Sequence, residues 1–487
     1  MQKITLNARK KIECEVLIIG SGPGGSITAA LLAEAGRDVV LVEEGPSSFK
    51  SSKPYSLDEM NQKYRNGGLT PAFGKTKITY IEPRCMGGGS EINAGLYHRP
   101  LKEKLDKWRA DYQIDNLEDK ALIPFYTANE RELSISTVPD GAGPASMKIQ
   151  TGAEKMKWEA HEIPRWWKYS KNDDGSFKGT RQSMSETFIP RAEKKGCRLL
   201  PNTKVKRIAL QSNTGKYALA ISTNEISEEI KLKIYFRYVF VCGGAVQTPT
   251  LLRRSGIKKN IGDSLAMHPM VRMPALFSEK VNEEHRGVPV HQVQEFKPHL
   301  TLGCSLGTPP FLALWLADHP GNIRDRLKHW PNMAVYYAAT ITQKRGTIRN
   351  LPWLDEPFVR LPLTSKDMEL LGEGLYKLGR LLFSVGAVEL IPPVLGYPII
   401  QREQDLEIFR KRLPHGKTNI TTIHLFSSCP MGEDTRRCAV NSFGKLHGFE
   451  NIYINDASIL PGAPGVNPQG TIMALARRNV DHFLQNL

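Results

Sequence analysis

The sequence predicts an α/β fold organised around a dinucleotide-binding unit near its N-terminus, and three observations in one short stretch support this. An apolar, β-rich run at residues 16–19 stops at a glycine, which is typical of a buried strand. The pattern G-x-G-x-x-G follows at Gly20, Gly22 and Gly25, and it opens an Ala- and Leu-rich segment with high helix propensity. A second apolar run follows this helix and ends in Glu43. Strand, glycine turn, helix, strand and acid in this order are typical of a unit that holds a dinucleotide.

The glycines and the glutamate of this unit each have a physical role in binding a dinucleotide. Glycine allows a tight turn, and its missing side chain lets the backbone approach a pyrophosphate at the positive end of the helix. Glu43 lies 18 residues after Gly25, close to the spacing at which an acid accepts a hydrogen bond from a ribose hydroxyl. We therefore interpret Gly20, Gly22, Gly25 and Glu43 as cofactor-binding residues. By itself, the unit fits a nicotinamide dinucleotide or a flavin dinucleotide equally well.

The rest of the chain predicts a second domain that interrupts the first. Residues 100–195 alternate aromatic and charged residues in helix-like segments, which we interpret as an insertion. An antiparallel meander ends at residues 230–236, and residues 238–242 form a fully apolar strand. Residues 270–422 mix strands and helices, which is typical of a sheet covered by helices, and the apolar run at 311–317 predicts a buried strand. Further strands are expected at 77–81, 204–208, 216–222, 332–342 and 452–455, and helices at 185–195, 248–254, 367–385 and 469–483.

Composition and charge narrow the class of protein. The chain has 40% hydrophobic and 24% charged residues, and it has no apolar run near the ~20 residues of a membrane span and no signal-peptide pattern, so we expect a cytoplasmic protein. The net charge of +16 is dispersed without a nucleic-acid-binding motif, so we expect no nucleic-acid partner. Weak peripheral association with an anionic membrane remains an alternative. Seven cysteines without a C-x-x-C pair indicate neither a disulfide framework nor a metal site.

Two other stretches contain residue types that carry chemistry. Three consecutive glycines at residues 87–89 mark a place where the backbone bends or lies against something. Near the C-terminus, a stretch that begins with His424 is followed by a Pro/Gly-rich loop at residues 461–468 that contains Asn467. Taken singly, each also has a structural interpretation as a flexible loop, a core histidine or a turn-capping asparagine.

Four blocks, in order along the chain, resemble the glucose–methanol–choline (GMC) family of flavin-dependent oxidoreductases. They are the dinucleotide unit at 20–43, the loop Met86-Gly87-Gly88-Gly89-Ser90-Glu91-Ile92-Asn93, the segment 244–257, and the tail with His424, Met431-Gly432, Asp456-Ala457 and 465–469. The resemblance implies an FAD-binding Rossmann-like domain assembled from discontinuous segments, and a substrate domain with a large antiparallel sheet. We expect the first to comprise residues 1–99, 196–270 and 427–487, and the second residues 100–195 and 271–426.

The resemblance also implies FAD as the cofactor. It implies a cofactor site that contains Gly88 and Asn93 beside the flavin ring, Val205 beside the adenine, Asp456 and Ala457 beside the pyrophosphate or ribityl chain, and Asn467 and Pro468 in the tail loop. Some family members tether the flavin through a histidine one residue before the loop asparagine. Ile92 occupies that position here, so we expect non-covalent FAD.

The activity that the resemblance implies is oxidation of a small-molecule alcohol, a CH–OH donor, to an aldehyde or ketone. The hydride goes to flavin N5, His424 acts as base and Asn467 orients the hydroxyl. The apolar run at 311–317 and the abundant tryptophan favour a hydrophobic or bulky alcohol. Oxygen, a quinone or a redox protein is the expected electron acceptor. The alternative is a lyase or other non-redox enzyme of the same flavoprotein family with FAD in a structural role. The other blocks disfavour a nicotinamide dehydrogenase, and the tail motif disfavours a non-catalytic flavoprotein.

Overall fold

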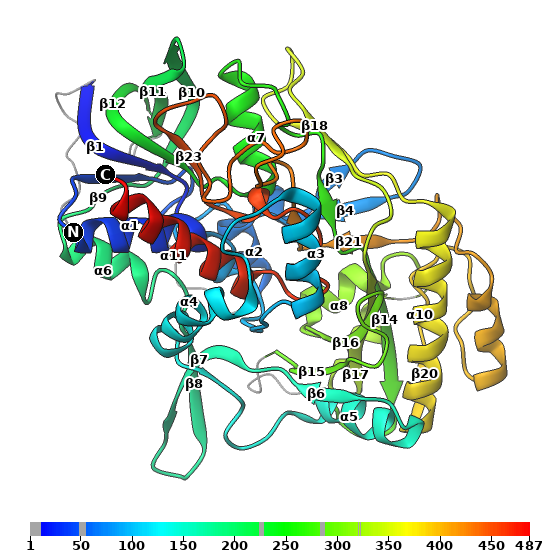
Figure 1. Ribbon diagram of the computed structural model, residues 1–487. Coiled ribbons are helices and arrows are strands. Elements are labelled where there is room, and N and C mark those ends of the chain that lie inside the picture. Colours follow the sequence, from blue (N-terminus) through cyan, green and yellow to red (C-terminus); the bar gives the residue numbers. More distant parts are fainter. Residues whose placement is uncertain (1–10, 48–54, 224–227, 283–287, 320, 322) are drawn as a thin grey trace.

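The computed structural model describes residues 11–47, 55–223, 228–282, 288–319, 321 and 323–487, and two large sheets organise it (Figure 1). The first sheet has seven strands in the order β10-β11-β12-β1-β2-β9, with β23 also paired to β12. These strands span Thr203–Gln211 (β10), Thr214–Thr223 (β11), Glu229–Val241 (β12), Lys11–Ile19 (β1), Val39–Val42 (β2), Arg198–Leu200 (β9) and Ile452–Ile454 (β23). Strands β12, β1, β2, β9 and β23 are parallel, and β10 and β11 extend the sheet as an antiparallel meander.

Strand register brings the sequence motifs of this sheet to one edge. Ile19 at the end of β1 is level with Val241 of β12 and with Val42 of β2. Gly20 and Glu43 therefore follow at the same carboxyl edge, which is where open α/β sheets bind their ligands. The fully apolar core of β1 is buried on both faces, as expected for a strand inside a parallel sheet.

Helices cover this sheet on one side. Helix α1 (Pro23–Glu34) packs against α11 (Gln469–Gln485) and α6 (Phe188–Lys194), and Figure 1 shows the three close together near the two termini. Helix α4 (Asp119–Glu132) packs against α11 in turn, and α3 (Lys102–Tyr112) precedes it. Apolar residues of these helices, including Trp108 and Phe188, join the core of the first sheet.

The second sheet has nine strands in the order β3-β4-β21-β14-β17-β16-β15-β6, with β20 also paired to β14. It comprises Thr70–Ala72 (β3), Ile78–Tyr80 (β4), Ile420–Thr422 (β21), Met270–Phe277 (β14), Met333–Thr340 (β17), Leu300–Ser305 (β16), His291–Val293 (β15), Ala160–Glu162 (β6) and Ala387–Leu390 (β20). All of its strand pairs are antiparallel except that of β4 with β21. Helices α5 (Pro144–Met156) and α10 (Ser365–Ser384) pack on this sheet and share its apolar core. The antiparallel sheet covered by helices is thus confirmed.

Smaller elements complete the described part of the chain. They are α2 (Leu57–Lys63), α7 (Gly244–Arg254), α8 (Pro309–Leu316), α9 (Ile323–Leu327), β5 (Ile135–Ser136), β7 (Arg165–Lys171), β8 (Phe177–Arg181), β13 (Ala266–Met267), β18 (Thr347–Arg349), β19 (Phe358–Arg360) and β22 (Leu425–Phe426). Within the described residues, no helix is both long enough and apolar enough to cross a bilayer.

The buried strand predicted at residues 311–317 is wrong, because this segment is helix α8. Two prolines occupy the first turn, where a helix tolerates them and where their fixed φ favours it. Leu312 and Leu316 pack into one apolar cluster, whereas Phe311 and Trp315 line a cavity. Because both sides of this short helix meet apolar surroundings, its sequence is a continuous apolar run without helical periodicity.

Four smaller differences concern the boundaries of strands, helices and domains. The meander strand expected at 230–236 and the apolar strand expected at 238–242 are one strand, β12. Helix α7 begins earlier than expected, so Pro249 lies in its interior. Residues 70–80, expected in the cofactor domain, pair in the nine-stranded sheet, and the insertion expected at 100–195 includes helices packed on α1 and α11. The domain boundaries stay a prediction.

Candidate active site

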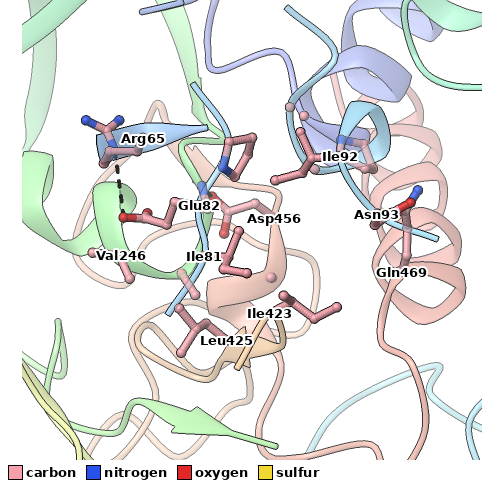
Figure 2. A pocket seen from close by; sticks show the side chains of 18 of the residues that line it. Arg65, Ile81, Glu82, Ile92, Asn93, Val246, Ile423, Leu425, Asp456 and Gln469 are labelled. Atoms are coloured by element: carbon pink, nitrogen blue, oxygen red, sulfur yellow. Dashed lines mark hydrogen bonds and ion pairs between the residues drawn. The ribbon is translucent and has the colours of Figure 1, made fainter. Parts of the chain in front are cut away.

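A cavity of about 380 Å³ lies between the two sheets, and its lining comes from segments as far apart as Ile19 and Ile472. At one end it meets the glycine-rich edge of the first sheet, and at the other it meets β14, β16, β17 and α8. Figure 2 shows side chains from these distant segments, among them Glu82, Ile92, Val246 and Leu425, around a common space. A concave, mainly apolar space with a few polar groups is the usual form of a cofactor or substrate site.

The three motif glycines have different surroundings. Gly20 has φ +102°, and a Cβ there would lie 2.4 Å from the carbonyl oxygen of Cys242, so the turn requires glycine. A Cβ on Gly25 would lie 1.9 Å from the oxygen of Gly20, because the first turn of α1 rests on the end of β1. A Cβ on Gly22 would meet no atom within 4 Å, and Gly22 lines the cavity. Gly22 is therefore open to a ligand, whereas Gly20 and Gly25 serve close packing.

Glu43 is buried beside this turn and lines the cavity. Its carboxylate accepts hydrogen bonds from Ser21 N (3.0 Å), Ser21 Oγ (2.7 Å) and Gly45 N (2.8 Å). Burial raises its pKa, although these hydrogen bonds oppose the rise. Since a carboxylate offers about four acceptor positions, one remains for a ligand hydroxyl.

The second glycine loop is docked directly on the first. Gly88 has φ +56°, and a Cβ there would lie 2.6 Å from the Cα of Gly22. The N–H of Gly87 donates to Ser21 Oγ at 3.0 Å, which fixes the two loops together. Asn93, at the end of this second loop, donates to Gln469 Oε1 and accepts from Gly95 N at 3.0 Å, and Figure 2 shows Asn93 and Gln469 facing each other. The loop thus joins the first glycine turn to the start of α11.

A charged cluster that the sequence did not predict lies beside Val205, which lines the cavity from β10. Arg65 Nη2 is 2.6 Å from Glu44 and its Nε is 3.7 Å from Glu82, the contact drawn in Figure 2. Lys204 Nζ lies 3.1 Å from Glu44. Burial raises the pKa of Glu82 to about 7 despite the charge of Arg65. Burial would also raise the pKa of Glu44, but the hydrogen bond and charge of Arg65 lower it to about 2.

Asp456 follows β23 and fixes the first turn of α7 and the backbone at Ser458 at the cavity wall. Its carboxylate accepts from Gly244 N (2.7 Å) and Thr248 Oγ1 (2.5 Å) of α7, and from Ser458 N (2.8 Å) and Ser458 Oγ (2.5 Å). Its side chain is therefore fully used within the protein. Asp456 and its neighbour Ala457 both line the cavity, as do Asn467 and Pro468 in the loop before α11.

His424 lies between the short strands β21 and β22, where its backbone exchanges hydrogen bonds with Thr422 Oγ1. Its Nδ1 is 3.2 Å from Nδ1 of the buried His268, so one of the two rings donates to the other. Burial and the charge of Arg272 lower the pKa of His424 to about 3, and burial with His424 also lowers that of His268. Both rings are therefore neutral at physiological pH.

Asn467 faces the same end of the cavity as His424, and both also line a smaller cleft of about 30 Å³. Its Oδ1 accepts from Gln292 Nε2 at 3.4 Å, and Gln292 Nε2 also donates to Tyr337 Oη at 2.8 Å. The side-chain NH₂ of Asn467 makes no hydrogen bond to any residue that the structure describes. The amide is thus oriented by its oxygen and keeps its donors free.

All of the predicted site residues except Gly25 line one cavity, and Gly25 packs behind it. Sequence reasoning missed Gln292 and Tyr337 because neither belongs to a motif, and it interpreted His268, which lies near a motif, as structural or cofactor-adjacent. It also missed Arg272, for which one signal existed: a single charge within the apolar strand β14, MVRMPALF. No group of three or more His, Cys, Asp or Glu side chains capable of holding a metal occurs among the described residues.

Models of known families match most of the chain. One model described as GMC oxidoreductase matches residues 60–270, a second matches residues 352–476, and a model described as FAD binding domain matches residues 13–63. All four blocks of the sequence resemblance lie within these ranges.

Individual proteins agree with these matches. An uncharacterized GMC-type oxidoreductase of Sinorhizobium fredii is 38% identical over 99% of this chain and 97% of its own length. A long-chain-alcohol oxidase of Arabidopsis thaliana is 26% identical over 96% of this chain and 68% of its own. The crystal structure of pyridoxine 4-oxidase from Mesorbium loti shares the fold, with a TM-score of 0.75 at 17% identity over 97% of this chain and 99% of that one.

The family uses FAD, so FAD is the cofactor of this protein, and Ile92 leaves no histidine at the tethering position. The two family matches and the full-length relative together establish that the chain belongs to the GMC oxidoreductases.

Proposed function

We propose that this chain oxidises an alcohol at its CH–OH group to an aldehyde or ketone, with His424 as base and Asn467 orienting the hydroxyl. The observation that carries the proposal is a single cavity shared by the N-terminal glycine turn and by His424 and Asn467 from the C-terminal end of the chain. The names of the Arabidopsis long-chain-alcohol oxidase and of pyridoxine 4-oxidase support this class of reaction.

The cavity suits FAD because its wall is bare backbone at the start of α1. Gly22 would admit a Cβ without contact, so a pyrophosphate has room beside N–H groups at the positive end of that helix. We assign the ADP half to Gly20, Gly22, Glu43 and Val205, with Gly25 shaping the turn by close packing from behind, and the flavin half to Gly88, Asn93, Asp456, Ala457, Asn467 and Pro468. When bound, FAD supplies the electron acceptor for the hydride that leaves the alcohol carbon.

His424 is suited to take the hydroxyl proton because its ring is neutral. In the active tautomer, Nδ1–H of His424 donates to Nδ1 of His268, which leaves the Nε2 lone pair of His424 free for the proton. In the other tautomer Nε2 of His424 carries the proton and cannot accept another from the substrate. The role of His424 as base therefore requires the tautomer of His268 in which Nδ1 accepts, and His268 is a positioning residue in this proposal.

Asn467 is suited to hold the substrate oxygen. Gln292 fixes its amide through Oδ1, and the free NH₂ can donate to the hydroxyl and to the negative charge that grows there as the proton leaves. A pre-oriented donor of this kind contributes roughly 10²–10³-fold in rate. The hydroxyl proton would pass to His424 as the carbon loses a hydride, and this two-electron oxidation would balance with FAD, when bound, as the acceptor.

Anaerobic mixing of the holoenzyme with a panel of alcohols tests the proposal. We expect the yellow colour of the flavin to bleach and one aldehyde or ketone to form for each flavin reduced. A lyase of the same family would turn over its substrate while the flavin stays oxidised, and that result would refute the proposal.

A further inference from the structure

Arg272 is a buried cation without an anionic partner in the part of the chain that the structure describes. It lies on β14, its residue is 6% exposed, and it lines the cavity that contains His424. No Asp or Glu of the described residues lies within ion-pair distance of it. The acids that do line this cavity, Glu43, Glu44, Glu82 and Asp456, are all bonded to other groups.

The contacts of Arg272 leave donors unused. A guanidinium has five N–H donors. Nε donates to Ser305 Oγ at 3.3 Å, Nη1 donates to Thr421 Oγ1, and Nη2 makes a weak contact with the sulfur of Met270 at 3.8 Å. One N–H on each of the two terminal nitrogens therefore remains. The ring of Trp315, whose centre is 4.5 Å from the guanidinium carbon, supports the charge but accepts no full hydrogen bond.

A buried charge without an oppositely charged partner lowers the stability of the folded protein. Burial without a counter-charge is strongly unfavourable, so charges inside proteins are almost always paired. Burial lowers the pKa of Arg272 to about 10, which still leaves the group charged at neutral pH. An arginine retained here without a protein carboxylate is explained if its partner is the ligand that enters the cavity.

We propose that Arg272 binds a carboxylate group of the substrate, so that the alcohol oxidised at His424 is a hydroxy acid. This rests on the proposed alcohol oxidation. The two free N–H groups of a planar guanidinium match the two oxygens of a carboxylate. The surrounding wall, with Leu306, Phe311 and Trp315, is apolar, so an apolar chain joins the carboxylate to the alcohol carbon.

Two further observations agree with an anionic substrate. The charge of Arg272 is one cause of the low pKa of His424, so a carboxylate paired with Arg272 would relieve that repulsion when His424 takes up a proton. The formal net charge of +16 also attracts anions to the molecule as a whole.

Paired substrates test the proposal directly. We would compare ω-hydroxyhexanoate and ω-hydroxydecanoate with their methyl esters in anaerobic flavin reduction by the wild-type holoenzyme. At least one acid should be preferred over its ester by about tenfold or more in the ratio of reduction rate to dissociation constant. In Arg272→Met we expect a loss on the order of 100-fold for that acid, so that the preference disappears, and partial recovery in Arg272→Lys.

Binding of unreactive hexanoate, followed through the visible spectrum of the bound flavin, gives a second readout. Hexanoate should perturb the spectrum of the wild type, and Arg272→Met should need at least about tenfold more of it. Arg380→Met, at an exposed ion pair with Glu403, is the matched control and should behave as the wild type. Melting temperature and flavin content show whether Arg272→Met is folded. If the charge lacks a protein partner, this variant should melt at or above the wild-type temperature.

The outcomes separate this inference from the proposed function. Esters oxidised as well as acids, with no spectral effect of hexanoate, would overturn the role of Arg272 and leave alcohol oxidation intact. Weaker FAD binding by Arg272→Met, with an unchanged hexanoate affinity in the variant saturated with FAD, would also overturn it, since Arg272 would then serve the cofactor. If no alcohol or hydroxy acid bleaches the flavin, the proposed function fails, while hexanoate binding still decides whether Arg272 is an anion site.

Discussion

The imidazole ring of His424 is uncharged at neutral pH, because burial and the charge of Arg272 lower its pKa from 6.5 to about 3. A base acts only in its deprotonated form, and the lowered pKa keeps that form present throughout the neutral and mildly acidic range. We therefore expect the rate constant for anaerobic flavin reduction to change little between about pH 5.5 and 8. Rapid-mixing measurements of flavin bleaching in this range provide the check.

The direction of the pKa shift of His424 makes this prediction specific. A histidine with the ordinary pKa would be about nine-tenths protonated at about pH 5.5, and the rate would fall about tenfold from its value at high pH. Observation of that fall, with a midpoint near pH 6.5, would mean that the ring of His424 is not desolvated in the working enzyme.

At the scale of elements, we propose that the turn between β1 and α1 contains one glycine that serves the fold and one that serves the cofactor. Alanine at Gly25 would place a Cβ 1.9 Å from the oxygen of Gly20, and overpacking of this kind destabilises by about 1–3 kcal/mol or more. Alanine at Gly22 meets no protein atom and should leave stability unchanged, but its methyl group enters the space that we assign to the pyrophosphate. We expect Gly22→Ala to fold normally and to bind FAD weakly.

Urea unfolding of the apoprotein and titration with FAD measure the two effects separately. The exposed Gly416, where a Cβ also meets nothing, is the matched control, and Gly416→Ala should change neither quantity. Equal loss of stability in Gly22→Ala and Gly25→Ala would contradict this division of roles.

The sequence predicted this element well because its information is local. Strand, turn and helix follow within about thirty residues. Each glycine is either required by a close contact or lines the cavity. The prediction of a strand at residues 311–317 was wrong for a local reason as well, because a short apolar run has no periodicity that distinguishes a strand from a helix. The pairing of β4 with β21 joins residues about 340 positions apart, and no local pattern specifies it.

The candidate site was predictable only where a motif marked it. His424 and Asn467 stood out in a recognisable tail. His268 and Gln292, which contact them, are single residues brought there by the fold of the second domain. Arg272 was visible as a charge in an apolar strand, but only the structure shows that no described carboxylate pairs with it.

At the scale of the whole molecule, the cavity is lined by both sheets and by segments from both ends of the chain. A ligand that binds there binds the folded protein alone and must stabilise it. At a free FAD concentration of about 100 times its dissociation constant, we expect about 2.7 kcal/mol of added stability and a higher Tm. Thermal unfolding of the apoprotein with increasing FAD measures this.

Flavin mononucleotide serves as the control ligand, because it lacks the adenosine that we assign to Glu43 and Val205, and it should raise Tm less at equal concentration. The Gly22→Ala variant should need more FAD for the same increase. An equal effect of the two flavins would contradict the role of the first sheet in holding the ADP half.

The most direct test of alcohol oxidation at His424 is the rate of flavin bleaching in a single anaerobic turnover. The wild type and His424→Gln, both loaded with FAD, are mixed with an alcohol that carries hydrogen or deuterium at the carbinol carbon. We expect deuterium to slow bleaching of the wild type several-fold, and His424→Gln to bleach about 10²–10⁴-fold more slowly while it keeps its FAD. Bleaching of His424→Gln at the wild-type rate would contradict the assignment of His424 as the base.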